Sequence, residues 1–178
     1  MKQFSSIKSR EISYKDKIVK AKVVSITSCF NHNTEFFFAQ EMIKKNTLEI
    51  VKPYATIRLL KDNLDSKLWK EGFVYELNVK PYGLINIWGV HYINIIKIDP
   101  ANTQIITEEN NNICKIWNHS LTFKKVNESQ TEYTDEVILY AGKLTKFLSY
   151  FLVISYKQRH RNWNKKLNSL LNSLIKTS

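Results

Sequence analysis

Two strand-like segments in the last third of the chain carry the side chains best suited to chemistry. Trp117, His119, Leu121 and Phe123 alternate along the first segment, and Asp135 lies in the second. Diagonal neighbours on paired antiparallel strands are within reach of each other, so Asp135 could accept an N–H bond from His119 and fix its tautomer. Such a pair in a cavity could act as a general base. Without a ligand, the same pair would only anchor the hairpin.

Two arginines follow on a long apolar segment. Arg159 and Arg161 could pair with Asp135 or Glu136, or bind the anionic head of a ligand through two parallel bonds. Long basic side chains also extend into solvent, with their stems on apolar surface. The sequence leaves these alternatives open.

Other kinds of chemistry find little support. The four histidines lack the paired spacing of metal ligands, and the two cysteines form neither a disulfide framework nor a Cys-x-x-Cys pair. The sequence has no glycine-rich phosphate loop and no Gly-x-Ser-x-Gly elbow. We therefore expect no metal and no cofactor, and the sequence argues against nucleotide hydrolysis and serine-ester chemistry.

The elements that must position these residues are mostly strands. Asn33 or Thr34 is suited to cap the first of two short helices within residues 33–45. Apolar residues alternate along most of the remaining chain, and short turns between strands predict an antiparallel meander. We expect the order strand, two short helices, six strands and long helix. The clearest strand patterns cover residues 18–26, 73–80, 84–98, 104–109, 113–126 and 131–140.

The C-terminal segment has the apolar spacing of a helix. Its period of three and four residues predicts one apolar stripe over some thirty residues, or roughly 45 Å. Since a curved sheet must bury its concave face, this helix is the expected cover. The predicted stripe contains Leu144, Phe147, Leu148, Phe151, Ile154 or Ser155, Trp163, Leu167, Leu170, Leu171 and Leu174.

This order of elements, together with three motifs, resembles the SRPBCC superfamily, which includes START-like, Bet v 1-like and polyketide cyclase/dehydrase-like proteins. The closest likeness is to its uncharacterised bacterial ligand-binding branch. It covers about residues 18–170, but only the last third has specific motifs. The matching residues are Trp117 and His119, then Thr134, Asp135 and Val137, then Arg159, His160 and Arg161.

The resemblance implies an α+β helix-grip fold. We expect a curved antiparallel sheet of about seven strands, two short helices after the first strand, and a long C-terminal helix over the concave face. Residues 1–17 would be an extended N-terminal arm, and residues 18–178 a single domain. Ala141–Lys143 stand where relatives tend to have Pro-Phe-Gly, which would alter the hinge into the helix or the mouth of the cavity.

The resemblance also implies a hydrophobic pocket between sheet and helix. Our leading hypothesis is the binding or carriage of a small hydrophobic or amphipathic ligand, such as a lipid, an isoprenoid or an aromatic metabolite. A simpler alternative is that aromatic side chains fill the space. The candidate ligand-binding residues are Tyr75, Trp88, Tyr92, Trp117, His119, Phe123, Asp135, Val137, Leu148, Phe151, Ser155 and Arg159.

Two further hypotheses come from the His/Asp pair and from the charge. In an enzyme of the cyclase, dehydratase or hydrolase kind, His119 and Asp135 would transfer protons. Of the net charge of +11, most lies at the two ends: residues 143–178 hold eight Lys/Arg and no acidic residue. This helix could contact an anionic membrane, RNA or a protein partner. We expect a cytoplasmic monomer or weak dimer, since no secretory signal is visible.

Overall fold

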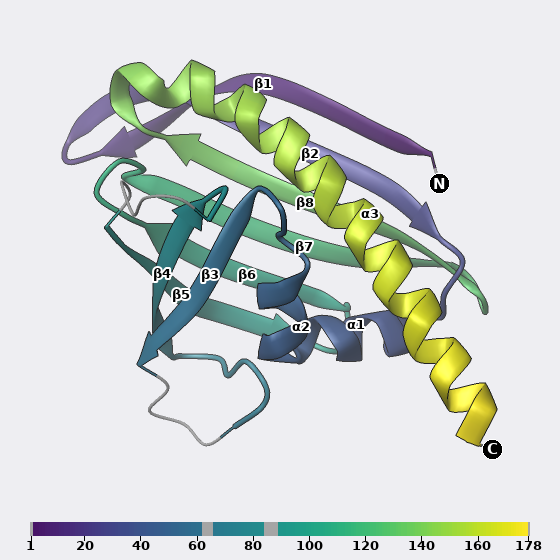
Figure 1. The fold of residues 1–178 in the computed structure, drawn as a ribbon. Coiled ribbons are helices and arrows are strands. Elements are labelled where there is room, and N and C mark those ends of the chain that lie inside the picture. The colour runs from purple at the N-terminus through teal and green to yellow at the C-terminus, as the bar shows by residue number, and fades with distance from the viewer. Residues whose placement is uncertain (1, 62–65, 84–88, 178) are drawn as a thin grey trace.

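In a computed structural model, described for residues 2–61, 66–83 and 89–177, an eight-stranded antiparallel sheet wraps around a long C-terminal helix (Figure 1). The strands lie in the order β1-β2-β8-β7-β6-β5-β4-β3. Along the chain the elements are β1 (Gln3–Tyr14), β2 (Lys17–Phe30), α1 (Thr34–Met42), α2 (Lys44–Glu49), β3 (Ala55–Lys61), β4 (Val74–Pro81), β5 (Val90–Asp99), β6 (Gln104–Asn110), β7 (Ile116–Asn127), β8 (Gln130–Tyr140), the 3-10 turn η1 (Gly142–Leu144) and α3 (Thr145–Thr177).

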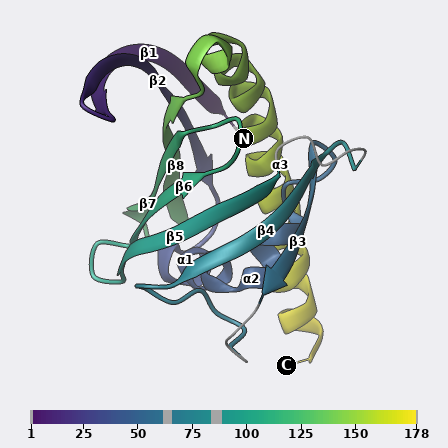
Figure 2. The ribbon, with the colours of Figure 1, turned by 90° about the vertical axis from the view of Figure 1, so that its left-hand side faces the viewer.

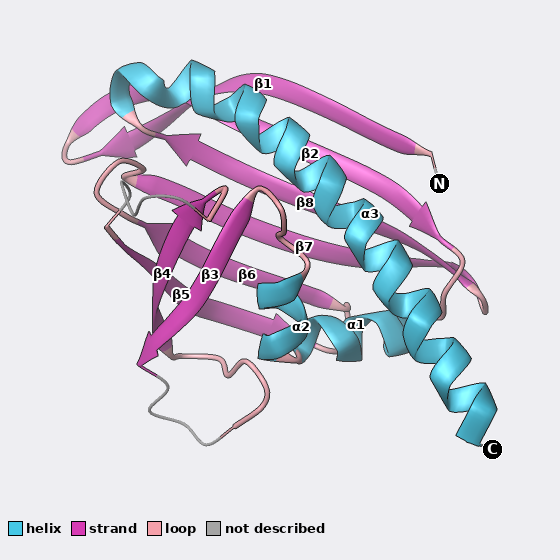
Figure 3. Ribbon diagram, viewed as in Figure 1, coloured by secondary structure: helices cyan, strands magenta, loops and turns pink. Residues whose placement is uncertain are grey.

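The sheet curves strongly around α3. Figure 2 shows β1 and β2 beside the upper part of the helix and β3 to β5 near its lower part. The strand register shifts between Ile95 and Lys97 of β5 and between Lys125 and Asn127 of β7. Such bulges bend a strand and increase its twist. The sheet therefore has a concave face, and α3 lies across it (Figure 3).

The predicted fold class is confirmed, with one more strand than expected. The segment taken as an extended arm contains β1, which pairs with β2 along its whole length, from Gln3–Ser28 to Tyr14–Lys17. Most of its side chains are exposed, so this edge strand forms through its backbone and leaves no clear apolar period in the sequence. The two short helices consequently follow the second strand.

The predicted strands agree with β2 and β4 to β8, although their ends differ by several residues. Of the segment expected at 84–98, β5 begins at Val90, and residues 84–88 lie outside the described part of the chain. Six strands were expected after the helices, and the sequence pattern located five of them. The one that it did not locate is β3. Asn33 caps α1 as predicted, because its side chain accepts the N–H of Phe36 at 2.9 Å.

Helix α3 turns a narrower face to the sheet than the predicted stripe implied. Ten apolar positions spread around more of a helix than one sheet can cover, so only some of them are inside. The buried apolar residues of α3 are Leu148, Leu152, Trp163 and Leu167. Contrary to the prediction, Phe147 and Leu174 of α3 and Leu144 of η1 are exposed; of the alternatives Ile154 and Ser155, Ile154 is exposed and Ser155 is partly buried.

The junction between β8 and α3 is a tight turn at Ala141–Lys143. Gly142 has a positive φ of 56°, which favours glycine. The Thr145 hydroxyl accepts the N–H of Ala141 at 2.9 Å and donates to the Gly142 carbonyl at 2.7 Å. These bonds set the direction in which α3 leaves the sheet. Within the described ranges, no helix combines the length and apolarity needed to cross a bilayer.

Candidate functional site

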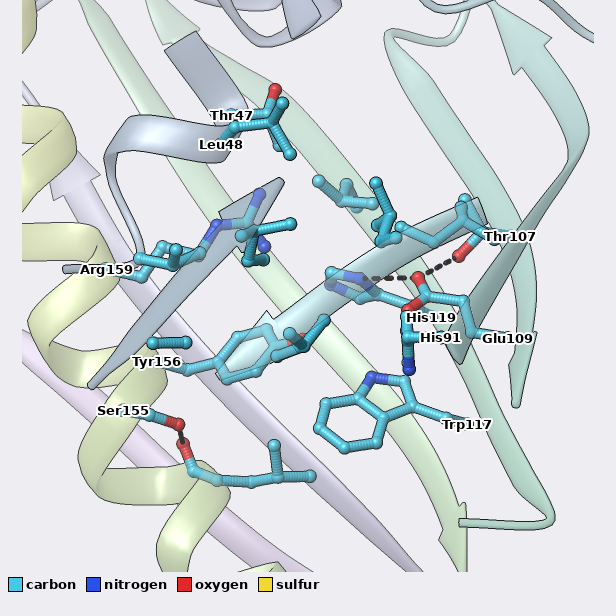
Figure 4. Close-up of a pocket in the computed structure, with 18 of the residues that line it drawn as sticks. Thr47, Leu48, His91, Thr107, Glu109, Trp117, His119, Ser155, Tyr156 and Arg159 are labelled. Atoms are coloured by element: carbon cyan, nitrogen blue, oxygen red, sulfur yellow. Dashed lines mark hydrogen bonds and ion pairs between the residues drawn. The ribbon is translucent and has the colours of Figure 1, made fainter. Parts of the chain in front are cut away.

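A cavity of about 170 Å³ lies between the concave face of the sheet and α3. Its apolar lining comes mainly from β3 to β5 and α2, and its polar lining from β5 to β7, α1 and α3. In Figure 4, Tyr156 and Arg159 extend from α3 toward Trp117 and His119 on the sheet. The polar or aromatic lining residues are Glu41, Thr47, Tyr54, Trp69, His91, Thr107, Glu109, Trp117, His119, Phe151, Ser155, Tyr156 and Arg159.

Four polar side chains form a diagonal row across four neighbouring strands. Thr107 faces His119 in the register, so Glu109 of β6 is a diagonal neighbour of His119 on β7. On the other side His119 faces Val137, which makes Asp135 of β8 its second diagonal neighbour. Such neighbours are within reach of long side chains. His91 of β5 completes the row, with Nε2 at 2.8 Å from Glu109 Oε2.

Asp135 is the centre of this cluster and is fully buried. Its Oδ1 accepts bonds from His119 Nε2 at 2.7 Å, the Tyr133 hydroxyl at 2.8 Å and Arg159 Nη1 at 3.1 Å. Its Oδ2 accepts a bond from His160 Nε2 at 2.9 Å. Burial opposes the charge, but Arg159 and the two histidines outweigh it and hold the pKa of Asp135 well below its usual value. Asp135 is therefore an ionised carboxylate.

Glu109 is a second buried carboxylate with a full set of donors. The Thr107 hydroxyl donates to its Oε1 at 2.6 Å, and His119 Nδ1 lies 3.6 Å from the same oxygen. Burial opposes ionisation, but the bonds with His119 and His91 lower the pKa of Glu109 to about 2. Asn111 donates its amide N–H to His91 Nδ1 at 3.0 Å, which places the His91 proton on Nε2, toward Glu109.

His119 lies between the two carboxylates and carries a positive charge. Burial opposes this charge, but hydrogen bonds with Asp135 and Glu109 overcome it and raise the pKa of His119. His160 differs, because burial lowers its pKa and its Nδ1 lies 2.8 Å from the Ser28 hydroxyl. We assign His160 as neutral, with its Nε2 proton directed at Asp135.

Arg159 connects this cluster to α1 and to the cavity. Its Nη2 donates to Glu41 Oε1 at 2.6 Å, while Nη1 donates to Asp135. The guanidinium also lies 5.5 Å from the centre of the Tyr156 ring. Burial raises the pKa of Glu41, an effect that Arg159 partly offsets. His119 thus lies between Glu109 and Asp135, and Arg159 between Asp135 and Glu41, so each buried carboxyl group faces a cation.

This arrangement favours a polar recognition surface over proton transfer by His119. Both ring nitrogens of His119 face carboxylate oxygens, and neither is a free acceptor for a substrate proton. Burial raises the pKa of Tyr156, whose hydroxyl therefore stays protonated and can donate. Among the described residues, no group of three or more His, Cys, Asp or Glu has the geometry to hold a metal ion.

The structure brings some of the predicted ligand-binding residues to the cavity. The predicted contact between His119 and Asp135 is confirmed, and so is the pairing of Arg159 with Asp135. Arg161 is exposed and makes no contact with either acidic residue proposed for it. Five predicted residues line the cavity: Trp117, His119, Phe151, Ser155 and Arg159.

Other predicted residues lie away from the cavity. Asp135 does not line the cavity, but it hydrogen-bonds to His119 and Arg159, which do. Tyr75 is buried against Trp69, with ring centres 4.7 Å apart, and Tyr92 is partly exposed to solvent. Three more predicted residues are packed in the hydrophobic core, namely Phe123, Val137 and Leu148. Trp88 lies outside the described residues.

Sequence analysis missed several polar residues of the cavity, most importantly Glu41, Glu109 and Tyr156. One signal was present for Glu109, because Ile105, Thr107 and Glu109 alternate on the buried face of β6. A carboxylate at an inward position of such a strand indicates a buried polar partner. Glu41 gave no comparable signal, since α1 is too short to show which of its faces is inside.

The comparisons with known proteins identify the fold. No family model and no curated protein matches this chain. Solved structures do match, at low identity. A START superfamily protein from Mycobacterium smegmatis has a TM-score of 0.61 and 12% identity, over 83% of this chain and 98% of that one. Zhui aromatase/cyclase from Streptomyces sp. R1128 has a TM-score of 0.61 and 13% identity, over 82% and 93%.

A third similar structure is norcoclaurine synthase from Thalictrum flavum, in complex with dopamine and hydroxybenzaldehyde. Its TM-score is 0.61 and its identity 6%, over 84% of this chain and 87% of that one. These likenesses define the chain as a helix-grip protein, with the fold of START-like and Bet v 1-like members of the SRPBCC superfamily. The fold that the resemblance implied is confirmed, while the bacterial ligand-binding branch stays a prediction.

Proposed function

We propose that this protein binds a small amphipathic molecule of one or two rings in the cavity between its sheet and α3. The observation that carries the proposal is a cavity of about 170 Å³ with one apolar and one polar wall. For scale, an engineered apolar cavity of about 150 Å³ in another protein binds benzene. Of the three expected ligand classes, the volume favours an aromatic metabolite over a long-chain lipid or an isoprenoid.

The polar wall supports a ligand with a hydroxyl, carbonyl or amino group on its ring. Thr107 lines the cavity from β6, and Tyr156 and Arg159 line it from α3; Thr107 donates to the ionised Glu109 and Arg159 to the ionised Asp135. A ring placed against the apolar wall would bring one polar substituent to these groups. The two ligands in the norcoclaurine synthase structure, dopamine and hydroxybenzaldehyde, are molecules of this size, which agrees with the proposal.

Binding or carriage is a better fit than catalysis by His119 and Asp135. These two residues are bonded to each other and to Glu109 and Arg159, so neither of them is a free base directed into the cavity. What it offers a ligand is a set of fixed dipoles and charges. Such groups give orientation and specificity, while apolar burial contributes affinity at about 25 cal/mol per Å².

The test is calorimetric titration with 4-hydroxybenzaldehyde, indole and decanoate as probes. We expect the two ring compounds to bind and to raise Tm, and decanoate to bind more weakly. Ser155→Phe on α3 fills the cavity and should abolish ring binding. Ser169→Phe makes the same change at an exposed position of the same helix and should leave binding intact.

Two outcomes would contradict the proposal. One is that neither ring compound binds the unmodified protein, and the other is that Ser155→Phe binds them as well as Ser169→Phe does. Native mass spectrometry of gently purified protein adds an independent readout, because a carried ligand appears as a mass difference. Tight decanoate binding would move the ligand class toward lipids.

A further inference from the structure

The outer face of the first half of α3 carries an apolar surface that the sheet does not cover. Leu144, the last residue of η1, and Phe147, Tyr150 and Ile154 of α3 are 48%, 70%, 55% and 54% exposed. They follow one another at intervals of three, three and four residues, which places them on one side of the helix. We call these four residues the outer stripe. Since the sheet holds α3 by its opposite side, the outer stripe is not needed for the core.

Basic residues surround the outer stripe. Lys143 is exposed just before its first member and Lys146 between its first two, and Arg161 and Lys165 continue the same side of the helix toward the C-terminus. Residues 143–178 contain no acidic residue. A helix with an apolar side and flanking lysines and arginines is typical of segments that lie in the interface of an anionic bilayer.

The outer stripe continues toward Phe151, one of the residues that line the cavity. Phe151 follows Phe147 by one helical turn, is half-buried, and lines the cavity. Its ring lies 6.3 Å from that of Tyr54 and 6.4 Å from that of Tyr82, centre to centre. Tyr82 is 55% exposed. One band of apolar surface therefore runs from the outer stripe to these three rings at the edge of the cavity.

We infer that the outer stripe docks on an anionic lipid membrane, with its apolar side chains among the acyl chains and the flanking lysines on lipid phosphates. The mixture of residues supports a membrane over a nucleic acid. RNA could pair its phosphates with the positive charges and stack its bases on Phe147 and Tyr150, but Leu144 and Ile154 would stay in water. A bilayer interface accommodates both the aliphatic side chains and the charges.

Docking in this position would place the Phe151 edge of the cavity at the membrane surface. A small ring compound that partitions into lipid could then enter without passing through water. This consequence depends on the proposed ligand, whereas the docking itself does not. The two can therefore fail separately.

The test is flotation of the purified protein with vesicles of phosphatidylcholine, with and without phosphatidylglycerol. We expect binding to the anionic vesicles that weakens as salt is raised. The double variant Phe147→Ser with Ile154→Ser should lose on the order of tenfold or more in affinity, because burial of each apolar side chain contributes. Lys143→Gln with Lys146→Gln should lose the preference for anionic vesicles while keeping weak binding to the others.

A matched control removes the same kind of surface at the far end of the sheet. Phe4 and Val126 are 64% and 53% exposed, and Phe4→Ser with Val126→Ser should bind vesicles normally. In Phe147→Trp, the new indole should shift its emission to shorter wavelength on docking. Equal vesicle binding by the Phe147→Ser/Ile154→Ser variant and the Phe4→Ser/Val126→Ser control would overturn the inference. So would binding to poly(U) with none to vesicles, which would assign the basic surface to RNA.

Discussion

The cavity has two walls that are built in opposite ways. The apolar wall consists of Ile57, Leu77, Val79 and Ile95 on β3 to β5, held by packing alone. The polar wall consists of side chains that hydrogen-bond one another before any ligand arrives, with Asp135 behind them. Apolar packing tolerates a substitution of similar volume, whereas a buried charge cluster fails when one partner is lost. The apolar wall should therefore determine which sizes fit, and the polar wall which orientation.

The largest effect is expected from Asp135→Asn. This change leaves the buried Arg159 and His119 without their shared carboxylate and should lower the free energy of unfolding by about 3–5 kcal/mol. Urea denaturation at neutral pH measures it. Glu128→Gln is the control, since this exposed carboxylate pairs only with Lys125 on the surface and should change stability by less than about 1 kcal/mol. Similar losses in both variants would mean that the polar wall is not held by its charges.

The apolar wall should respond differently to Leu77→Ala. Leu77 is fully buried and already borders the cavity, so its truncation should cost about 2–4 kcal/mol and enlarge the space. The loss should be the same at pH 5 and pH 7, because Leu77 contributes no charge. Calorimetry should show that a two-ring probe such as naphthol gains affinity relative to the one-ring 4-hydroxybenzaldehyde. A loss that depends on pH would show that the two walls are not independent.

Glu109→Gln on the polar wall should cost an unfolding free energy that depends on pH, unlike Leu77→Ala on the apolar wall. Glu109 has its pKa lowered to about 2, so its contribution is complete above about pH 4.5, the value of the unfolded chain, and is lost as the pH falls toward 2. The loss is about 1.4 kcal/mol per pH unit within that window. The difference in unfolding free energy between native protein and variant should thus be largest near pH 5 and shrink by pH 3. A constant difference would contradict the assignment of Glu109 as ionised.

The sequence predicted the polar wall only where local patterns were sufficient. The alternation of Trp117 to Phe123 and a hairpin register were enough to bring His119 and Asp135 together. Glu109 required the register of a third strand, and Glu41 required the position of α1 against α3. Neither can be read from a period of two or four residues. The predicted stripe on α3 failed for a related reason, since apolar spacing does not say which part of a wide stripe the sheet will cover.

The smallest expected effect tests whether a neutral donor matters on the polar wall. Thr107 donates to Glu109 at 2.6 Å and lines the cavity, so Thr107→Val removes one hydrogen bond while keeping the shape of the side chain. Because Glu109 keeps its bonds with His91 and His119, the loss in unfolding free energy should be only about 1–2 kcal/mol. Thr56→Val at an exposed position of β3 should cost less than about 0.5 kcal/mol. If Thr107→Val matches that control in stability yet weakens binding of 4-hydroxybenzaldehyde, the Thr107 hydroxyl serves the ligand and not the fold.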